Sequence, residues 1–240
     1  MTTRRTAPAR RTSILCYGDG NTHGTRATTT PGAVSRFRGN VRWTGALATA
    51  LGPSVRVIEE GLPDRTTVHD DPVEGAHKNG LRFLPAALET HRPVDIVFLM
   101  LGTSDLKARY AMTAADVARS LERLLMCIAG APCGPNGTPP QAVVIAPAPI
   151  LERGPLAQTF AGGAEKSLAL CHHLAESAER FGAGFIDAGA HAEVDPTDGV
   201  HLGEAGHAAL GAALAAYARS HLLEACRPSA PVSRLRRGAR

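Results

Sequence analysis

The run VDIVFLML at residues 94–101 is the feature that most constrains how this chain can fold. It has the length of a strand, and it is almost continuously apolar, which is typical of a strand covered on both faces. Shorter apolar runs occur at residues 13–17 (SILCY) and 142–146 (AVVIA). Strands of this kind predict a parallel sheet that lies between two layers of helices.

Helical patterns separate these runs. We expect further strands at residues 54–60 and 184–187, and helices at residues 43–51, 76–90, 164–181, 203–225 and from Thr113 onward. Thr113 is a good N-cap residue, and Asp116 in the first turn suits the positive end of the helix dipole. Strands that alternate with helices predict a doubly wound α/β fold with right-handed crossovers.

The positive charge of the chain is concentrated at its two ends. The formal net charge is +4, yet residues 1–12 hold four arginines, residues 227–240 hold five, and neither segment has an acidic residue. We expect both segments to be disordered basic tails that flank one domain at residues 13–226. The tails are the segments whose charge suits nucleic acid, and otherwise no nucleic-acid partner is expected.

Other patterns exclude several classes of protein. No apolar run is long enough to span a membrane, and no apolar segment of a secretory signal precedes residue 13, so we expect no membrane partner. Five cysteines without a C-x-x-C pair favour a reduced, cytoplasmic location. Cys171, His172 and His173 are adjacent in an expected helix, so their side chains diverge and do not share a metal ion.

Polar motifs follow the predicted strands. They are residues 18–21 (GDGN), 61–67 (GLPDRTT), 102–105 (GTSD) and, before the last helix, 198–201 (DGVH). The carboxyl ends of parallel strands meet at one edge of a sheet, where doubly wound proteins bind their ligands. We therefore expect the four motifs to form one site.

The same motifs carry a resemblance to a known family. Residues 14–22 (ILCYGDGNT), 59–67 (EEGLPDRTT), 100–107 (MLGTSDLK) and 198–202 (DGVHL) are similar, in order and spacing, to the four sequence blocks of the SGNH (GDSL-type) hydrolases. Residues 68–72 and 79–82 resemble the arylesterase/acyltransferase branch of that family. The resemblance runs from about residue 13 to residue 225. It implies a flavodoxin-like α/β/α sandwich, with a five-stranded parallel sheet in the order 2-1-3-4-5.

The resemblance also implies a chemistry, the hydrolysis or transfer of short acyl groups from esters without a cofactor or a metal. In the family, a serine attacks the ester, a histidine accepts its proton, and an aspartate orients the histidine. His201 and Asp198 match the last two. The implied partner is a small ester or acyl ligand, and members of the branch often form homo-oligomers. Residues expected to support the site are Asp19, Asn21, Arg65 and Asp105.

Three positions depart from the family pattern. Gly20 stands where the nucleophilic serine is expected, and loss of that serine typically costs about 10⁶-fold in turnover. Asp64 replaces a small residue and Ser104 replaces an asparagine at the oxyanion hole, to which the main chain of Gly20 and Asp64 would also contribute. An Asp64 carboxylate that faced the site would oppose a developing oxyanion by about 3 kcal/mol.

The sequence therefore supports more than one hypothesis about whether the chain is an enzyme. The leading hypothesis is a pseudoenzyme that binds an ester or acyl ligand in the old pocket. Alternatives are an esterase silenced by a Ser→Gly replacement at position 20, and a hydrolase in which His201 and Asp198 activate a water beside Gly20 or in which Ser104 is a displaced nucleophile. The remaining interpretations are a metal site among Asp19, Asp64, Asp105 and His201, a helix-capping role for Asp198 and His201, and a bracing role for Arg65.

Overall fold

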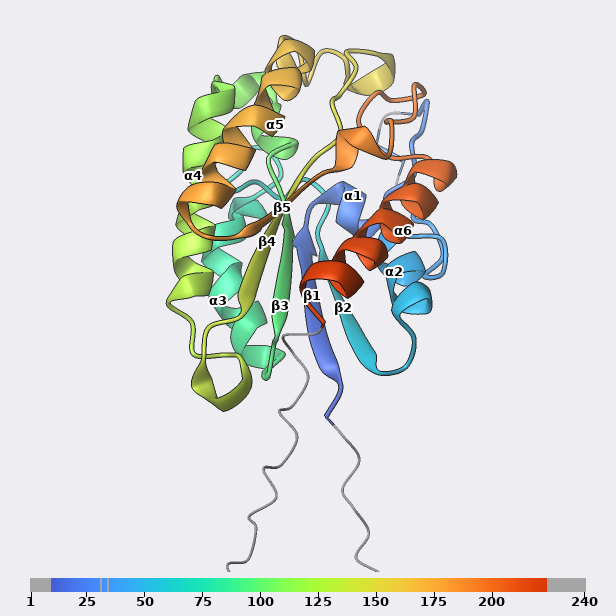
Figure 1. Ribbon diagram of the computed structural model, residues 1–240. Helices are drawn as coiled ribbons and strands as arrows, with labels where there is room; N and C mark the ends of the chain where they lie inside the picture. Colours follow the sequence, from blue (N-terminus) through green and yellow to red (C-terminus); the bar gives the residue numbers. More distant parts are fainter. Residues whose placement is uncertain (1–9, 31, 34, 224–240) are drawn as a thin grey trace, which may run out of the picture.

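The computed structural model describes residues 10–30, 32, 33 and 35–223. One five-stranded parallel sheet, with strand order β2-β1-β3-β4-β5, lies between two layers of helices (Figure 1). This order is the one that the family resemblance predicts. The strands are β1 (Thr12–Gly18), β2 (Val55–Gly61), β3 (Ile96–Met100), β4 (Gln141–Ala146) and β5 (Gly184–Asp187).

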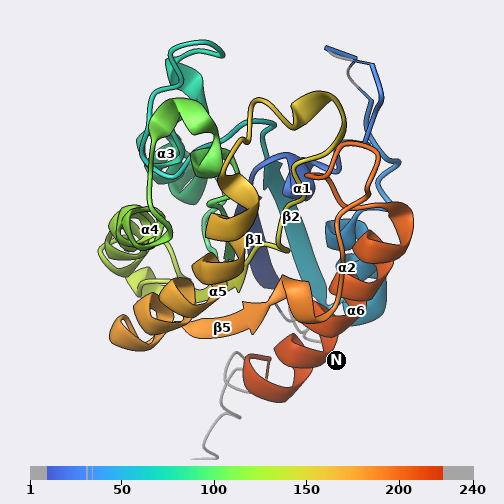
Figure 2. The same ribbon diagram turned by 90° about the horizontal axis from the view of Figure 1, so that it is seen from above.

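The helices fall into two groups on opposite faces of the sheet. They are α1 (Gly20–His23), α2 (Trp43–Leu51), α3 (Gly80–Thr90), α4 (Ala114–Ala129), α5 (Gly163–Arg180) and α6 (Glu204–His221). Short 3-10 turns lie at Ala76–Lys78, Ser104–Leu106, Ala108–Tyr110, Pro135–Gly137, Gly154–Leu156 and Ala188–Ala190. Helices α3, α4 and α5 cover one face, whereas α2 and α6 pack together on the other (Figure 2).

The central strand β3 explains why the sheet needs both layers. All five of its residues are buried, as its apolar sequence predicts. Val97 and Leu99 belong to the hydrophobic core beneath α3, α4 and α5. Ile96, Phe98 and Met100 belong to the core beneath α2 and α6. Side chains alternate between the two faces of a strand, so one apolar run contributes to two cores at once.

Helix α4 begins as the sequence predicts. The Thr113 hydroxyl accepts the backbone N–H of Asp116 at 3.1 Å, and the Asp116 carboxylate reaches back to the backbone N–H of Thr113 at 3.4 Å. This reciprocal pair is a capping box, which satisfies two donors that a helix start leaves free. Val117, Leu121 and Leu125 then fall on the buried face of the helix.

Several boundaries differ from the sequence prediction. Strand β1 begins at Thr12, and the Arg10 guanidinium pairs with the buried Asp95 carboxylate at 2.5 and 2.7 Å, so residues 10–12 are part of the folded body. Residues 1–9 and 224–240 lie outside the described residues, and their predicted disorder stays a prediction. Asn79 divides the expected helix 76–90, because its side chain accepts the backbone N–H of Arg82 and caps α3.

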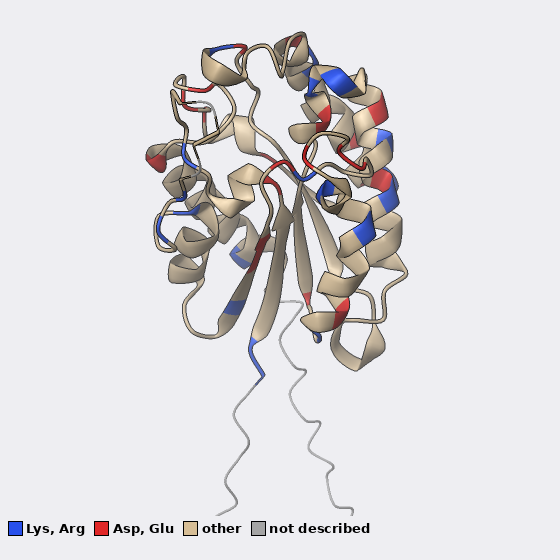
Figure 3. Ribbon diagram, turned by 180° about the vertical axis from the view of Figure 1, so that it is seen from behind, with Lys and Arg blue, Asp and Glu red and all other residues tan. Residues whose placement is uncertain are grey.

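The described part of the chain offers no helix that is both long and apolar enough to cross a membrane. Within the same residues, no cluster of three or more His, Cys, Asp or Glu side chains could hold a metal ion. His172 and His173 both approach Glu176 on the exposed side of α5. Lys, Arg, Asp and Glu are interspersed along α4 and α5, whereas α2 carries none of them (Figure 3).

Candidate active site

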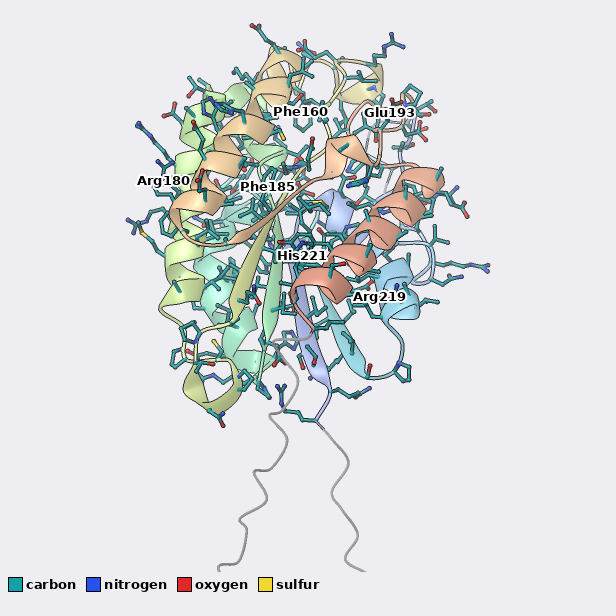
Figure 4. The ribbon with its side chains drawn as sticks, in the orientation of Figure 1. Phe160, Arg180, Phe185, Glu193, Arg219 and His221 are labelled. Atoms are coloured by element: carbon teal, nitrogen blue, oxygen red, sulfur yellow. The ribbon has the colours of Figure 1, made fainter. Side chains whose placement is uncertain are left out.

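A cavity of about 590 Å³ lies at the carboxyl edge of the sheet, and all four polar motifs line it. Gly20, Asp64, Ser104 and His201 come from the four motifs in turn. Phe160, from the segment before α5, lies above the strand ends and supplies part of an apolar wall (Figure 4). The sequence prediction that the four motifs share one site agrees with this arrangement.

Asp198 and His201 form a tight pair on the loop between β5 and α6. His201 Nδ1 lies 2.7 Å from Asp198 Oδ2, and the backbone N–H groups of Val200 and His201 donate to Asp198 Oδ1 at 2.9 and 3.0 Å. Burial opposes ionisation of Asp198, but the hydrogen bonds from His201 and the main chain outweigh it and lower the pKa of that carboxyl. An ionised Asp198 accepts a hydrogen bond from Nδ1–H of His201, so Nε2 keeps a free lone pair in the cavity.

The capping interpretation of this pair is wrong. The N-cap of α6 is Gly203, which has no side-chain cap. The Asp198 carboxylate instead accepts hydrogen bonds from the main chain of its own loop and from the imidazole of His201. The pair therefore orients a histidine at the cavity and does not start the helix.

Gly20 is in direct reach of the imidazole. A Cβ built on Gly20 would lie 2.7 Å from His201 Nε2, 3.1 Å from His201 Cδ2 and 3.5 Å from Thr25 Oγ1. Real Cβ atoms essentially never approach another heavy atom to less than 3.0 Å. The edge of the imidazole thus occupies the space beside Gly20, and the room for a water that the sequence suggested there is taken by the ring.

Asn21 ties the first motif to the last. Its side-chain Nδ2 donates to the Val200 carbonyl at 3.1 Å, and its Oδ1 accepts the backbone N–H of Leu202 at 2.8 Å. These two bonds hold the main chain on either side of His201. Asp19 in turn accepts the backbone N–H of Asn21 at 3.0 Å, so both residues support the site as predicted from sequence.

Asp64 has a partner that the sequence did not reveal. Its Oδ1 accepts a hydrogen bond from Lys107 Nζ at 2.7 Å, and Lys107 Nζ also donates to Asp71 Oδ2 at 3.3 Å. Arg109 donates to the other oxygen of Asp71 at 2.9 Å. The sequence led us to expect that an Asp64 carboxylate facing the site would oppose an oxyanion, and the ion pair with Lys107 offsets that charge. Asp64 also has a φ of 63°, a left-handed conformation that Asp tolerates better than most residues.

Ser104 and Asp105 have different roles in the third motif. Ser104 begins a 3-10 turn and lines the cavity. Asp105 is fully buried and accepts the Thr67 backbone N–H and hydroxyl at 3.0 and 2.5 Å, which joins the third motif to the second. Burial raises the pKa of Asp105 to about 7, although the bonds from Thr67 oppose the shift. Burial likewise raises the pKa of Asp19 to about 6.

Arg65 braces the loops and stays out of the cavity. It is only 6% exposed, its guanidinium donates to the carbonyls of Gly18 and Glu60, and it lies 4.1 Å above the ring of Tyr17. This agrees with the bracing role that the sequence suggested. The metal interpretation finds no support among the described residues, since Asp64 pairs with Lys107 and Asp105 with Thr67.

The comparison with known families decides what kind of site this is. Residues 16–209 match the GDSL-like lipase/acylhydrolase family. The chain belongs to this family. The matched residues include parts of all four motifs that line the cavity.

Solved structures of acylhydrolases have the same fold. The aryl esterase of M. smegmatis is 38% identical, with a TM-score of 0.83 over 87% of this chain and 99% of its own. A carbohydrate acetylesterase from Sinorhizobium meliloti is 35% identical, with a TM-score of 0.82 over 88% of this chain and 99% of its own. A lipolytic G-D-S-L protein from Veillonella parvula is 14% identical with a TM-score of 0.61 over 88% of this chain and 98% of its own, so it shares the fold alone. No curated protein matches this chain.

Proposed function

We propose that this GDSL-family chain binds short acyl esters in its cavity and does not form an acyl-serine intermediate. One observation carries the proposal: the residue that meets His201 Nε2 is Gly20, which has no hydroxyl. The resemblance of residues 14–22 to the family's first sequence block supports the view that Gly20 stands at the nucleophile position. Without that hydroxyl, His201 has no serine proton to accept, and no serine oxygen is present to take the acyl group in the first covalent step.

The rest of the cavity suits an ester. Pro155, Leu156 and Phe160 provide apolar surface for an acyl or aryl group. Gly20 and Asp64 can offer main-chain N–H groups, and Ser104 can offer a hydroxyl, to the carbonyl oxygen. Because Lys107 neutralises Asp64, this part of the cavity remains compatible with negative charge on that oxygen. A bound ester would therefore be held and polarised, but it would react slowly.

A Gly20→Ser variant tests the proposal, with Gly20→Ala as the matched control. The new Cβ of either variant must displace the His201 ring, which lies at the open cavity. Only serine adds a nucleophile. We expect Gly20→Ser to hydrolyse p-nitrophenyl acetate between about 10³-fold and 10⁶-fold faster than the unchanged chain, since the nucleophile accounts for about 10⁶-fold and an altered oxyanion hole reduces the gain.

Two results would contradict the proposal. One is an equal rate for Gly20→Ser and Gly20→Ala when circular dichroism shows both to be folded. The other is a gain that survives His201→Ala in the Gly20→Ser background, because that gain would not depend on the histidine. A gain that requires His201 supports the view that the rest of the catalytic geometry is in place.

A further inference from the structure

The position of the imidazole is unusual for a histidine that serves a serine. A histidine that accepts a serine proton lies about 2.8 Å from the hydroxyl oxygen, which puts its nitrogen about 3.5 Å from the serine Cβ. Here Nε2 is only 2.7 Å from the Cβ position of residue 20. The imidazole nitrogen has thus advanced toward the place where the family keeps its nucleophile.

The nitrogen at this place is itself a nucleophile. Asp198 Oδ2 accepts a hydrogen bond from Nδ1–H of His201 at 2.7 Å. In the neutral ring the single proton is then on Nδ1, and Nε2 has a free lone pair. The side chain of His201 is 17% exposed and lines the cavity, so an ester carbonyl can reach it. Histidine is one of the side chains that form covalent acyl intermediates in enzymes.

We propose that His201 Nε2 attacks activated esters directly and carries the acyl group as an N-acylimidazole. This inference rests on the proposed function, since it needs an ester in the same cavity. The lone pair of Nε2 forms a bond to the carbonyl carbon, and the aryl oxygen leaves with the electron pair of the broken C–O bond. The Nδ1 proton moves to Asp198, so the acylimidazole is neutral. Water then attacks the acyl carbon, the bond from that carbon to Nε2 breaks, and the carboxylic acid leaves. The second proton of the water passes to the solvent, and the proton on Asp198 returns to Nδ1.

This chemistry selects the substrate class. When Nε2 is the nucleophile and Nδ1–H is bound to Asp198, His201 has no proton to give to the leaving oxygen. Asp19, another acid that lines the cavity, has a pKa raised by burial to about 6 and is ionised at about pH 8. Because neither His201 nor Asp19 supplies a proton, we expect the leaving group to carry its own negative charge. Aryl esters and thioesters meet this requirement, whereas simple alkyl esters do not.

Two hydroxyls of the cavity are rival nucleophiles. Thr25 Oγ1 lies 3.5 Å from the Cβ position of Gly20 and 3.0 Å from His23 Nδ1. Burial and neighbouring arginines lower the pKa of His23 to about 4, which makes it a weak base for that threonine. Ser104 lines the same cavity, and among the described residues no base is hydrogen-bonded to its hydroxyl. The test must therefore locate the acyl group on a named residue.

The experiment mixes the full chain with an excess of p-nitrophenyl acetate at about pH 8. We expect a stoichiometric burst of p-nitrophenolate, the ultraviolet band of an N-acylimidazole that hydroxylamine discharges, and an acetyl group on His201 in peptide mass spectra after an acid quench. His201→Gln should lose the burst and the band. His172→Gln, which removes an exposed surface histidine, should keep both. Ethyl acetate should give neither the ultraviolet band nor an acetyl group on His201, because its leaving group is a poor anion.

Other outcomes overturn the proposal. Acetyl on Thr25 or Ser104 would identify a hydroxyl nucleophile. Turnover without an adduct, slowed in deuterium oxide, would identify a water activated by His201. A burst that persists in His201→Gln would remove the histidine from the reaction. If Gly20→Ser gains turnover while the unchanged chain forms no acylimidazole, the proposed function stands and this inference fails. If His201 is acetylated but Gly20→Ser gains nothing, the assignment of position 20 fails instead.

Discussion

Two regions border the same cavity and differ in how they are built. The histidine loop, residues 194–202, holds its aspartate and histidine as a hydrogen-bonded pair, with His201 Nδ1 2.7 Å from Asp198 Oδ2. The oxyanion rim (Gly20, Asp64 and Ser104) contains the three positions at which the sequence departs from the pattern that the family resemblance implies. The difference teaches that the position of a catalytic base and the chemistry of its neighbours are specified by separate residues.

The histidine loop is fixed by bonds that do not involve the side chain of residue 20. The backbone N–H of Asp195 donates to the His201 carbonyl at 2.7 Å, and that of Gly199 donates to the Asp195 carbonyl at 2.9 Å. An antiparallel bridge joins Val194 to Leu202. With Asn21 holding both sides of His201, the loop keeps its shape whatever the rim contains.

Once Gly20→Ser is in place, the largest further effect expected from a change at the rim is that of Ser104→Asn. An asparagine amide is a longer and better directed donor than a hydroxyl, and one oxyanion donor is worth about 10²–10³ in kcat. The Ser104 hydroxyl already supplies part of this stabilisation of the oxyanion. We therefore expect Ser104→Asn to raise kcat by about tenfold to a hundredfold. The measurement is steady-state hydrolysis of p-nitrophenyl acetate. An unchanged kcat would mean that position 104 does not contact the developing oxyanion.

The buried acids and histidines near the cavity make opposing contributions to stability. The pKa values of Asp105 and Asp19 are raised to about 7 and about 6 from 3.8, so the folded state binds extra protons and loses stability as pH rises through that window. His207 and His23 have pKa values lowered to about 4 from 6.5, so stability rises with pH over an overlapping window. Between about pH 4 and pH 6.5 the two effects largely cancel.

Single variants should separate these contributions. Asp105→Asn keeps an acceptor for Thr67 but removes the acid, so its unfolding free energy should rise relative to the parent chain as pH rises between about 4.5 and 6.5. His207→Gln keeps an acceptor for the backbone N–H of Trp43. Its unfolding free energy should fall relative to the parent chain as pH rises over the same range. Each slope should change by up to about 1.4 kcal/mol per pH unit. Urea unfolding at several pH values measures it, and parallel curves for all three proteins would refute the assignment.

The smallest effect is expected at Asp64. Since Lys107 already neutralises its carboxylate, Asp64→Gly in the Gly20→Ser background should change kcat by less than about threefold. Asp64→Ala should be less stable than Asp64→Gly by about 1 kcal/mol, because alanine is strained at a φ of 63°. Kinetics and thermal unfolding of the two variants check both statements. A much larger rise in kcat would show that the carboxylate acts as a full charge.

Most of the fold could be predicted from the sequence because its signals are local. The apolar run in β3 and the Thr113 cap depend on neighbouring residues, and both are confirmed. The order of the strands followed from the family resemblance. The meeting of four motifs at one edge is a general property of parallel sheets, and it too agrees with the structure.

The parts that could not be predicted depend on side chains that are distant in sequence. Lys107 and Asp71 stand next to motif residues, but nothing in their spacing shows that they pair with each other. The advance of the His201 ring toward Gly20 is likewise a packing effect that a sequence pattern does not encode. The cavity wall at Phe160 comes from a Pro/Gly-rich segment without a periodic pattern.

The clamp that Asn21 places on the main chain around His201 has an evolutionary consequence. Glycine codons of the form GGU and GGC become serine codons by one base change, and the clamp keeps the histidine loop in place through either allele. Loss or recovery of a serine at position 20 therefore needs no accompanying mutation in the loop. Under the proposed function, a lineage with this clamp crosses between forms without and with a serine nucleophile in one mutational step, and selection can act on each form as it arises.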